Sequence, residues 1–443
     1  MAWPAEATIA PSPPPAKIGR RRWIVVALLF AATVINYVDR QMLGLLKPLL
    51  SQEFHWSETD YADIIFWFQA SYAVSYLVCG RVIDRVGARW GYALTFVIWN
   101  LAHIAHGLAS GLVQFVLVRV ALGAGEAGNF PAGLKSVAEW FPRRERALAV
   151  GVFNAGSNVG AVITPLVVPA IVAVADWRMA FMVTGVISFA WLAAWLIFYR
   201  RPEEDRRLSA AERAHILSDA ITPTVSAGGP RLAWILRQRQ TWAYVLAKFL
   251  TDPIWWVFLF WLPDFLGRRF GLDLSGFGPP LVAIYLMSDI GSVAGGWLSS
   301  RLMRRGLGAN RARKLAMLMC AACVIPVLTA PWVGGLTAAV LIIGLATAGH
   351  QGFSANLMTL PSDLFPPTSV ATVVGLGGTA GAVGGMLMAK FTGWILQGTG
   401  SYGPVFLTAA VAYPLALLAI QALSPYLRPA MPDATGGGAP SGR

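Results

Sequence analysis

The stretch that decides the fold is residues 34–48, VINYVDRQMLGLLKP. It lies inside the first long apolar run of the chain, yet it places Asp39 and Arg40 side by side where lipid would be expected. A charged group at bilayer depth costs roughly 2.5–3.5 kcal/mol on insertion scales, so such groups usually face a bundle interior or a watery cavity. The chain turns apolar again after Arg40, which predicts one continuous helix. The alternative is a helix that ends at Asn36 and leaves the charges among the lipid headgroups.

Composition places the chain among membrane proteins. Of its 443 residues, 56% are hydrophobic and only 13% are charged, whereas soluble domains carry about 25% charged residues. The net charge of +13 is scattered between apolar runs, which fits basic cytoplasmic loops and argues against nucleic-acid binding. Cys320 and Cys323 have CxxC spacing inside an apolar run without a nearby Asp or His, so we expect helix packing there and neither a metal nor a cofactor.

Apolar runs of about 20 residues, the length that spans a bilayer, recur twelve times. They cover residues 22–49, 59–80, 90–108, 111–138, 146–173, 179–199, 241–266, 277–302, 313–332, 335–361, 368–394 and 403–427. The fold class expected is therefore an all-α polytopic membrane protein with twelve transmembrane helices. A polar central loop, 200–240, separates six-helix bundles at 22–199 and 241–427. Residues 1–21 and 428–443 are expected to be disordered, and the Lys and Arg of alternate loops predict that both ends are cytoplasmic.

The two halves look like weak copies of each other. Asp39 and Asp252 are acids in the first helix of each half (252 − 39 = 213), and Gly80 and Gly296 follow each second helix (296 − 80 = 216). The near-constant offset indicates a duplication. Paired membrane repeats are typical of alternating-access transporters, whose site lies near the midplane between the halves.

The most distinctive motif is residues 80–89, GRVIDRVGAR, between the second and third spans. Its predicted gating residues are Gly80, Asp84, Arg85 and Arg89. Gly80 would let helices approach closely and Gly87 suits a tight turn. Asp84 could complement a helix N-terminus or pair with an Arg and so latch the cytoplasmic side. A merely topogenic basic loop is the alternative. The pattern resembles motif A of the major facilitator superfamily.

The fourth span contains Arg119 and Glu126, seven residues apart and therefore on one helix face. Gly123, Gly125 and Gly128 thin the helix beside them. A buried carboxylate that gains and loses a nearby Arg as a cavity opens and closes can carry a proton. A fixed structural ion pair is the alternative.

Polar side chains in three other spans are candidates for the cavity wall. Asn154 accompanies small residues in the fifth span. In the seventh, Pro253 can break the helix, and Trp255 or Trp256 could stack on a sugar face or belong to an interfacial belt. Gln351 and Asn356 of the tenth span could read hydroxyl groups.

Together these segments resemble the anion:cation symporter family, and within it the hexuronate and galactonate transporters. The resemblance implies that Asp39, Glu126 and Arg119 serve proton coupling. The substrate-binding residues expected from the resemblance and the polar pattern together are Arg40, Tyr37, Tyr72, Asn154, Trp255, Gln351 and Asn356. Galactonate-type members carry an Asn in the eleventh helix, where this chain has Gly377-Gly378-Thr379.

The function expected is a proton symporter of a bacterial inner membrane that imports a monoanionic sugar acid, with a hexuronate such as glucuronate or galacturonate favoured. Its expected partners are the sugar acid, protons and lipid, and it is expected to be a monomer. Aromatic or dicarboxylic acids are alternative substrates, carried in either direction. A sensor with this fold would need a larger soluble domain than the central loop supplies, and neither a catalytic triad nor a metal cluster indicates an enzyme.

Overall fold

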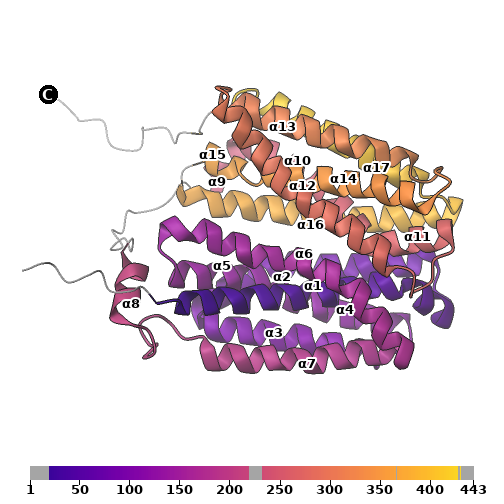
Figure 1. The fold of residues 1–443 in the computed structure, drawn as a ribbon, viewed down its shortest axis with the longest axis horizontal. Helices are drawn as coiled ribbons and strands as arrows, with labels where there is room; N and C mark the ends of the chain where they lie inside the picture. The colour runs from indigo at the N-terminus through magenta and orange to yellow at the C-terminus, as the bar shows by residue number, and fades with distance from the viewer. Residues whose placement is uncertain (1–18, 219–231, 366, 428–429, 431–443) are drawn as a thin grey trace, which may run out of the picture.

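The computed structural model describes residues 19–218, 232–365, 367–427 and 430, and every regular element within these ranges is a helix. Figure 1 shows two layers of long helices, the first half of the chain below and the second half above. The start of α1, the short helices α8 and α9, and α15 lie at the same end of the molecule, here called the near end (Figure 1). Nearly all of the two terminal segments expected to be disordered falls outside the described residues.

The first half forms a bundle of seven helices. These are α1 (Arg21–Phe54), α2 (Glu58–Val86), α3 (Ala88–His106), α4 (Leu112–Glu126), α5 (Asn129–Trp140), α6 (Arg143–Val174) and α7 (Trp177–Phe198). The expected central loop contains two short helices, α8 (Ala210–Leu217) and α9 (Leu232–Arg237).

The second half repeats this pattern. Its helices are α10 (Arg239–Phe260), α11 (Leu262–Phe270), α12 (Gly278–Arg304), α13 (Ala309–Val324), the 3₁₀ turn η1 (Ile325–Thr329), α14 (Leu336–Leu357), α15 (Leu360–Leu364), α16 (Pro367–Thr399) and α17 (Gly403–Leu423).

Ten stretches of the described chain are long and apolar enough to cross a membrane. The third and fourth of the twelve expected spans are filled by α3 and by α4 together with α5. The fourth span was expected to be continuous, but it breaks after Glu126, where the amide of Gly128 bonds to the carbonyl of Gly125. The corresponding span of the second half breaks in the same way between α14 and α15.

The prediction that Pro253 can break its helix is wrong, because α10 runs through it to Phe260. A proline in this position frees the carbonyl of Phe249. That carbonyl lies against Gly384 of α16, where a Cβ atom would stand only 2.5 Å from the oxygen. The close approach of α16 therefore supports α10 at the point where its own hydrogen bonding is interrupted. The helix ends at Phe260, and α11 begins at Leu262.

Small residues set the packing around α1. Cβ atoms at Gly156 and Gly160 of α6 would lie 2.5 Å from the carbonyl of Phe30 and 2.6 Å from that of Val34. Only glycine permits two helices to approach this closely. The α1 stretch that carries Asp39 and Arg40 is thereby held deep in the bundle, and both charged residues are almost fully buried.

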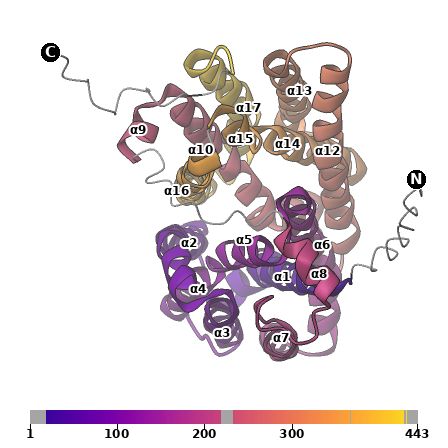
Figure 2. The ribbon, with the colours of Figure 1, turned by 90° about the vertical axis from the view of Figure 1, so that its left-hand side faces the viewer.

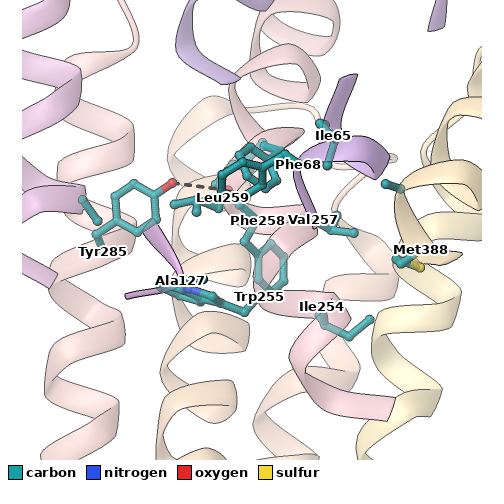
Figure 3. Close-up of a cluster of buried hydrophobic side chains, with 14 of the residues drawn as sticks. Ile65, Phe68, Ala127, Ile254, Trp255, Val257, Phe258, Leu259, Tyr285 and Met388 are labelled. Atoms are coloured by element: carbon teal, nitrogen blue, oxygen red, sulfur yellow. Dashed lines mark hydrogen bonds between the residues drawn. The ribbon is translucent and has the colours of Figure 1, made fainter. Parts of the chain in front are cut away.

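The halves meet through α2 against α16 and α6 against α12 (Figure 2). An apolar cluster fills the interface at the C-terminal part of α10. Figure 3 shows Phe258 and Leu259 of α10 beside Phe68 of α2 and Tyr285 of α12, whose hydroxyl donates to the carbonyl of Phe258. This apolar layer closes the space between the halves toward the far end, away from α8.

Helix α8 is docked on the near end of the first bundle by charged side chains. The backbone N–H of Arg22 donates to Glu212 of α8 at 3.1 Å, and Arg22 Nε donates to Glu145 at 3.0 Å. His215 of α8 is bonded to the same Glu145 carboxylate at 2.7 Å. The central segment is therefore part of the folded bundle as far as Ser218 and is not only a tether between the halves.

Candidate functional site

A cavity of about 270 Å³ lies between the two halves. The first half contributes Tyr37, Arg40, Tyr72 and Asn154 to its lining, and the second half contributes Lys248, Asp252, Trp255 and Gln351. Its size is close to the lower end of the ~300–1,000 Å³ typical of small-molecule sites. Six of the seven residues predicted to bind substrate therefore line one cavity.

The seventh, Asn356, does not line this cavity. Its side-chain amide donates to the carbonyls of Gly295 on α12 and Gly352 on α14, at 3.0 and 2.9 Å. Both glycines pack tightly, because a Cβ at Gly295 would overlap the backbone of Gly352. In this structure Asn356 therefore joins α12 to α14 and does not reach the cavity.

Arg40 forms a buried ion pair with Glu126. Its Nε donates to Oε2 of the carboxylate at 2.8 Å, and its Nη2 lies 2.6 Å from the same oxygen. Arg40 is 2% exposed and Glu126 is 0% exposed. The pair differs from the alternative considered from the sequence, a fixed ion pair of Glu126 with Arg119 of its own helix. Arg40 belongs to α1 and Glu126 to α4. Helical periodicity shows which residues share a face of one helix, but not which residues of two helices meet.

Aromatic rings surround the guanidinium of Arg40. Its central carbon lies 5.0 Å from the ring of Tyr72, 5.2 Å from Tyr37, 5.1 Å from Trp256 and 5.5 Å from Phe68. A cation over aromatic faces is stabilised electrostatically, and more strongly so away from water. Three of these rings, those of Tyr37, Tyr72 and Trp256, line the same cavity as Arg40.

Asp39 points into a different part of the bundle. Trp99 Nε1 donates to one of its carboxylate oxygens at 3.0 Å, and His103 Nε2 lies 3.3 Å from the other. The same His103 nitrogen is 2.8 Å from the hydroxyl of Thr184, which itself donates to a backbone carbonyl at 2.7 Å. The indole N–H of Trp99 and a ring nitrogen of His103, both on α3, thus face the Asp39 carboxylate.

Sequence reasoning missed Trp99 and His103. The available signal was the histidine itself, because an ionisable side chain inside a transmembrane run is a functional candidate by default. Trp99 lies four residues before His103 and so shares its helix face. That spacing places the two residues on one face of α3 but could not show that this face meets Asp39.

Arg119 is buried beside this cluster without a hydrogen-bond partner among the described residues. Its guanidinium lies 5.5 Å from the ring of Phe68, the same ring that contacts Arg40. Removing one partner of a buried ion pair costs about 3–5 kcal/mol. A buried cation without a hydrogen-bonded anion therefore needs a negative charge nearby. Glu126 and Asp39 are both near enough to supply it.

The second half presents a different surface. The rings of Trp255 and His350 stack at 5.3 Å with an interplanar angle of 8°. His350 is in turn bonded to the hydroxyl of Tyr413 at 2.6 Å. Lys248 and Asp252, one turn apart on α10, form an ion pair of 2.6 Å. One face of Trp255 is therefore occupied by His350, and the cavity wall here combines rigid aromatic rings with a neutral pair of charges.

The predicted gating motif lies at the near end. Gly87 adopts φ +89°, as the predicted tight turn requires, and Arg89 donates to the carbonyl of Leu196 at 2.7 Å. Arg85 is exposed, and the side chain of Asp84 lies outside the described residues. The expectation that Gly80 marks a close helix contact is wrong for this conformation, because a Cβ there would meet nothing within 4 Å.

The far end is held shut by a charged cluster that joins the two halves, here called the far-end lock. Lys47 Nζ, 1% exposed, lies 2.9 Å from Glu58 and 2.6 Å from Asp264 of the other half. Asp264 also accepts from Arg268 at 2.7 Å and from Tyr402 at 2.5 Å, and Arg268 contacts Glu58. Gly44 lies against the backbone of α10 in the same region.

A model of the Major Facilitator Superfamily matches residues 29–389. The chain belongs to the Major Facilitator Superfamily. It is accordingly a multi-pass membrane transporter and not an enzyme. The hexuronate transporter of Escherichia coli K12 is 36% identical over 413 residues, which cover 91% of this chain and 94% of that protein. The galacturonate transporter of Dickeya chrysanthemi is 36% identical over 327 residues, 72% of this chain and 94% of that protein.

Solved structures share the fold at low identity. The xylose transporter XylE of Escherichia coli, in an inward open conformation, aligns with a TM-score of 0.71 and 13% identity, covering 91% of this chain and 96% of that one. A bacterial homologue of the lysosomal transporter Spinster, in an inward-facing and occupied conformation, aligns with a TM-score of 0.69 and 18% identity, covering 93% and 97%.

Proposed function

We propose that this chain is a proton-coupled symporter that imports a hexuronate across a bacterial inner membrane by alternating access, with both termini cytoplasmic. The single observation that carries the proposal is the buried Arg40–Glu126 pair at the wall of the central cavity. A guanidinium suits a carboxylate because it can donate two parallel hydrogen bonds to it. The substrate class is taken from the hexuronate and galacturonate transporters that this chain resembles.

The coupling follows from counting charges. With the cavity empty, the acids Asp39 and Glu126 balance the bases Arg40 and Arg119. A substrate carboxylate adds one buried negative charge, which is costly. A proton taken up by Glu126 restores neutrality and releases Arg40, which then pairs with the substrate. By linkage, substrate and proton favour each other's binding by the same factor.

Alternating access is supported by the unequal ends of the molecule. The far-end lock and the apolar layer around Phe258 hold the halves together at one end, whereas at the other end no atom of the described residues would lie within 4 Å of a Cβ at Gly80. The cavity lining extends toward the near end through Tyr76 and Met358. Such an arrangement gives the site access from the near end, which the excess of basic residues assigns to the cytoplasm.

The test is uptake of labelled glucuronate and galacturonate into proteoliposomes, with and without an inward proton gradient. We expect accumulation above the equilibrium level only with the gradient, and inhibition by unlabelled hexuronates. An aromatic acid and a dicarboxylic acid serve as competitors, because these are the alternative substrates. Uptake of either competitor class in preference to both hexuronates would contradict the substrate assignment, and gradient-independent accumulation would contradict the coupling.

A further inference from the structure

Lys248 and Asp252 form a charged pair, and within the described part of the chain neither side chain has another ion-pair partner. Their 2.6 Å contact joins Nζ to Oδ2 within one turn of α10, and both residues line the cavity. The side chains are 7% and 20% exposed. Gly381 of α16 lies against the carboxylate, where any Cβ atom would clash with Asp252. The fold thus makes room for this pair inside the membrane, although a buried pair adds little net stability.

The pair stands close to Arg40 although it belongs to the other half. Trp256 follows Asp252 by four residues, one helical turn of about 5.4 Å. The guanidinium of Arg40 lies 5.1 Å from the ring of that same tryptophan. Arg40, Trp256, Lys248 and Asp252 all border the one cavity. A single small molecule can therefore meet the cation of the first half at one end and the Lys–Asp pair of the second half at the other.

The Arg40 side and the Lys248–Asp252 side of the cavity differ in the groups they can bind. A sugar hydroxyl both accepts and donates a hydrogen bond, so adjacent hydroxyls fit an ammonium and a carboxylate placed side by side. The pair has no net charge, and a neutral polyol part therefore adds no buried charge when it binds. A second carboxylate would instead meet Asp252 at close range, which is unfavourable away from water.

We propose, on the basis of the proposed function, that Lys248 and Asp252 form the hydroxyl-reading subsite of this transporter. Asp252 accepts a hydrogen bond from one hydroxyl of the substrate, and Lys248 donates a hydrogen bond to the adjacent hydroxyl. Arg40 holds the carboxylate of the same substrate. The subsite selects polyhydroxylated monocarboxylates over apolar monocarboxylates and over dicarboxylates of equal size. The second half thereby decides the substrate, while the first half supplies the carboxylate and proton chemistry.

Binding to the purified full-length protein tests this subsite with matched ligands. D-glucuronate is compared with tetrahydropyran-2-carboxylate, which keeps the ring and the carboxylate but has none of the hydroxyls. Each hydrogen bond to a charged group is worth about tenfold in affinity, so the wild-type protein should prefer glucuronate by at least tenfold. In Lys248→Met/Asp252→Leu, which removes both charges together, this ratio should fall to near one while tetrahydropyran-2-carboxylate binds as before.

Asp252→Asn supplies a second measure that preserves side-chain shape. It leaves Lys248 without its anion, so the affinity for glucarate, a sugar dicarboxylate, should rise about tenfold relative to glucuronate. Arg40→Lys is the matched control, since it should weaken both monocarboxylates alike and keep their ratio. Unchanged ratios in both α10 variants would overturn the subsite while leaving hexuronate transport intact. Wild-type protein that binds none of these acids would instead overturn the proposed function.

Discussion

Arg40 and Glu126 form one ion pair across two helices, with Nη2 of the guanidinium 2.6 Å from Oε2 of the carboxylate. The residues are 86 positions apart in the chain and both are buried. Arg40 also borders the cavity, whereas Glu126 lies behind it. An anion that draws Arg40 into the cavity therefore separates it from Glu126. The first two predictions rest on this exchange of partners.

Arg40→Lys should weaken hexuronate binding by at least about tenfold. The lysine keeps the charge but cannot donate two parallel hydrogen bonds to a carboxylate, and it loses much of the contact with the four surrounding rings. Calorimetry on purified protein measures the affinity, and thermal unfolding checks that the variant is folded. Arg304→Lys, at an exposed position without an assigned role, is the control. Near-normal affinity in the Arg40 variant would remove Arg40 from the carboxylate site.

Glu126→Gln should retain exchange of substrate between two pools but lose accumulation against a gradient. The amide resembles the protonated acid, so Arg40 is free for the substrate, yet no proton can be carried. Exchange and gradient-driven uptake in proteoliposomes give the two readouts. Asp39→Asn is measured in parallel, because Asp39 is the other candidate. Proton-driven accumulation in both variants would place the coupling site elsewhere.

Lys47→Met should shift the transporter toward the conformation that is open at the far end. Removing one partner of a buried ion pair costs about 3–5 kcal/mol, and this penalty falls only on the state in which the far-end lock is formed. Cysteines placed on the two ends report the shift, with far-end labelling expected to rise at least about tenfold.

Lys390→Met is the matched control for that experiment. Lys390 also contacts an acid of the other half, Asp63, but the two side chains are 46% and 38% exposed. Exposed pairs contribute about 0–1 kcal/mol, so labelling should barely change. Equal effects of the two substitutions would mean that burial of the Lys47 cluster is not what holds the far end shut.

Glu145→Gln should loosen α8 at neutral pH but not in acid. Partial burial raises the pKa of Glu145, but hydrogen bonds with His215 and Arg22 outweigh it and leave the pKa below its usual value. A lowered carboxyl pKa stabilises the folded state above the unfolded value near 4.3, and the contribution is lost as the pH falls through the folded pKa.

Amide hydrogen exchange of α8 measures that docking. Exchange in Glu145→Gln should be about fivefold faster than in wild type at pH 7, which corresponds to roughly 1 kcal/mol for the lost bonds. The ratio should approach one in acid, below the folded pKa. Glu203→Gln, at an exposed position between α7 and α8, is the control. A ratio that stays constant with pH would exclude the Glu145 carboxylate as the group that docks α8.

The sequence by itself determined the fold and named many of the residues of the candidate site. Apolar runs of spanning length are a local property, and so are the GRVIDRVGAR motif and the cost of placing Asp39 and Arg40 within such a run. The same local reasoning identified Arg119 and Glu126. These features indicated a two-bundle transporter because each depends only on residues close together in the chain.

Only the tertiary structure decided which of these groups meet. Helical spacing placed Arg119 on the same face as Glu126, but the close packing of α1 in the bundle brings Arg40 to the carboxylate. It also places Trp99 and His103 around Asp39, and it closes the far end through Lys47 and Asp264. Periodicity states which residues share a face of one helix, whereas lateral contacts depend on how neighbouring helices are placed and rotated. That placement follows from packing across the whole bundle, including glycine contacts such as Gly160 against Val34.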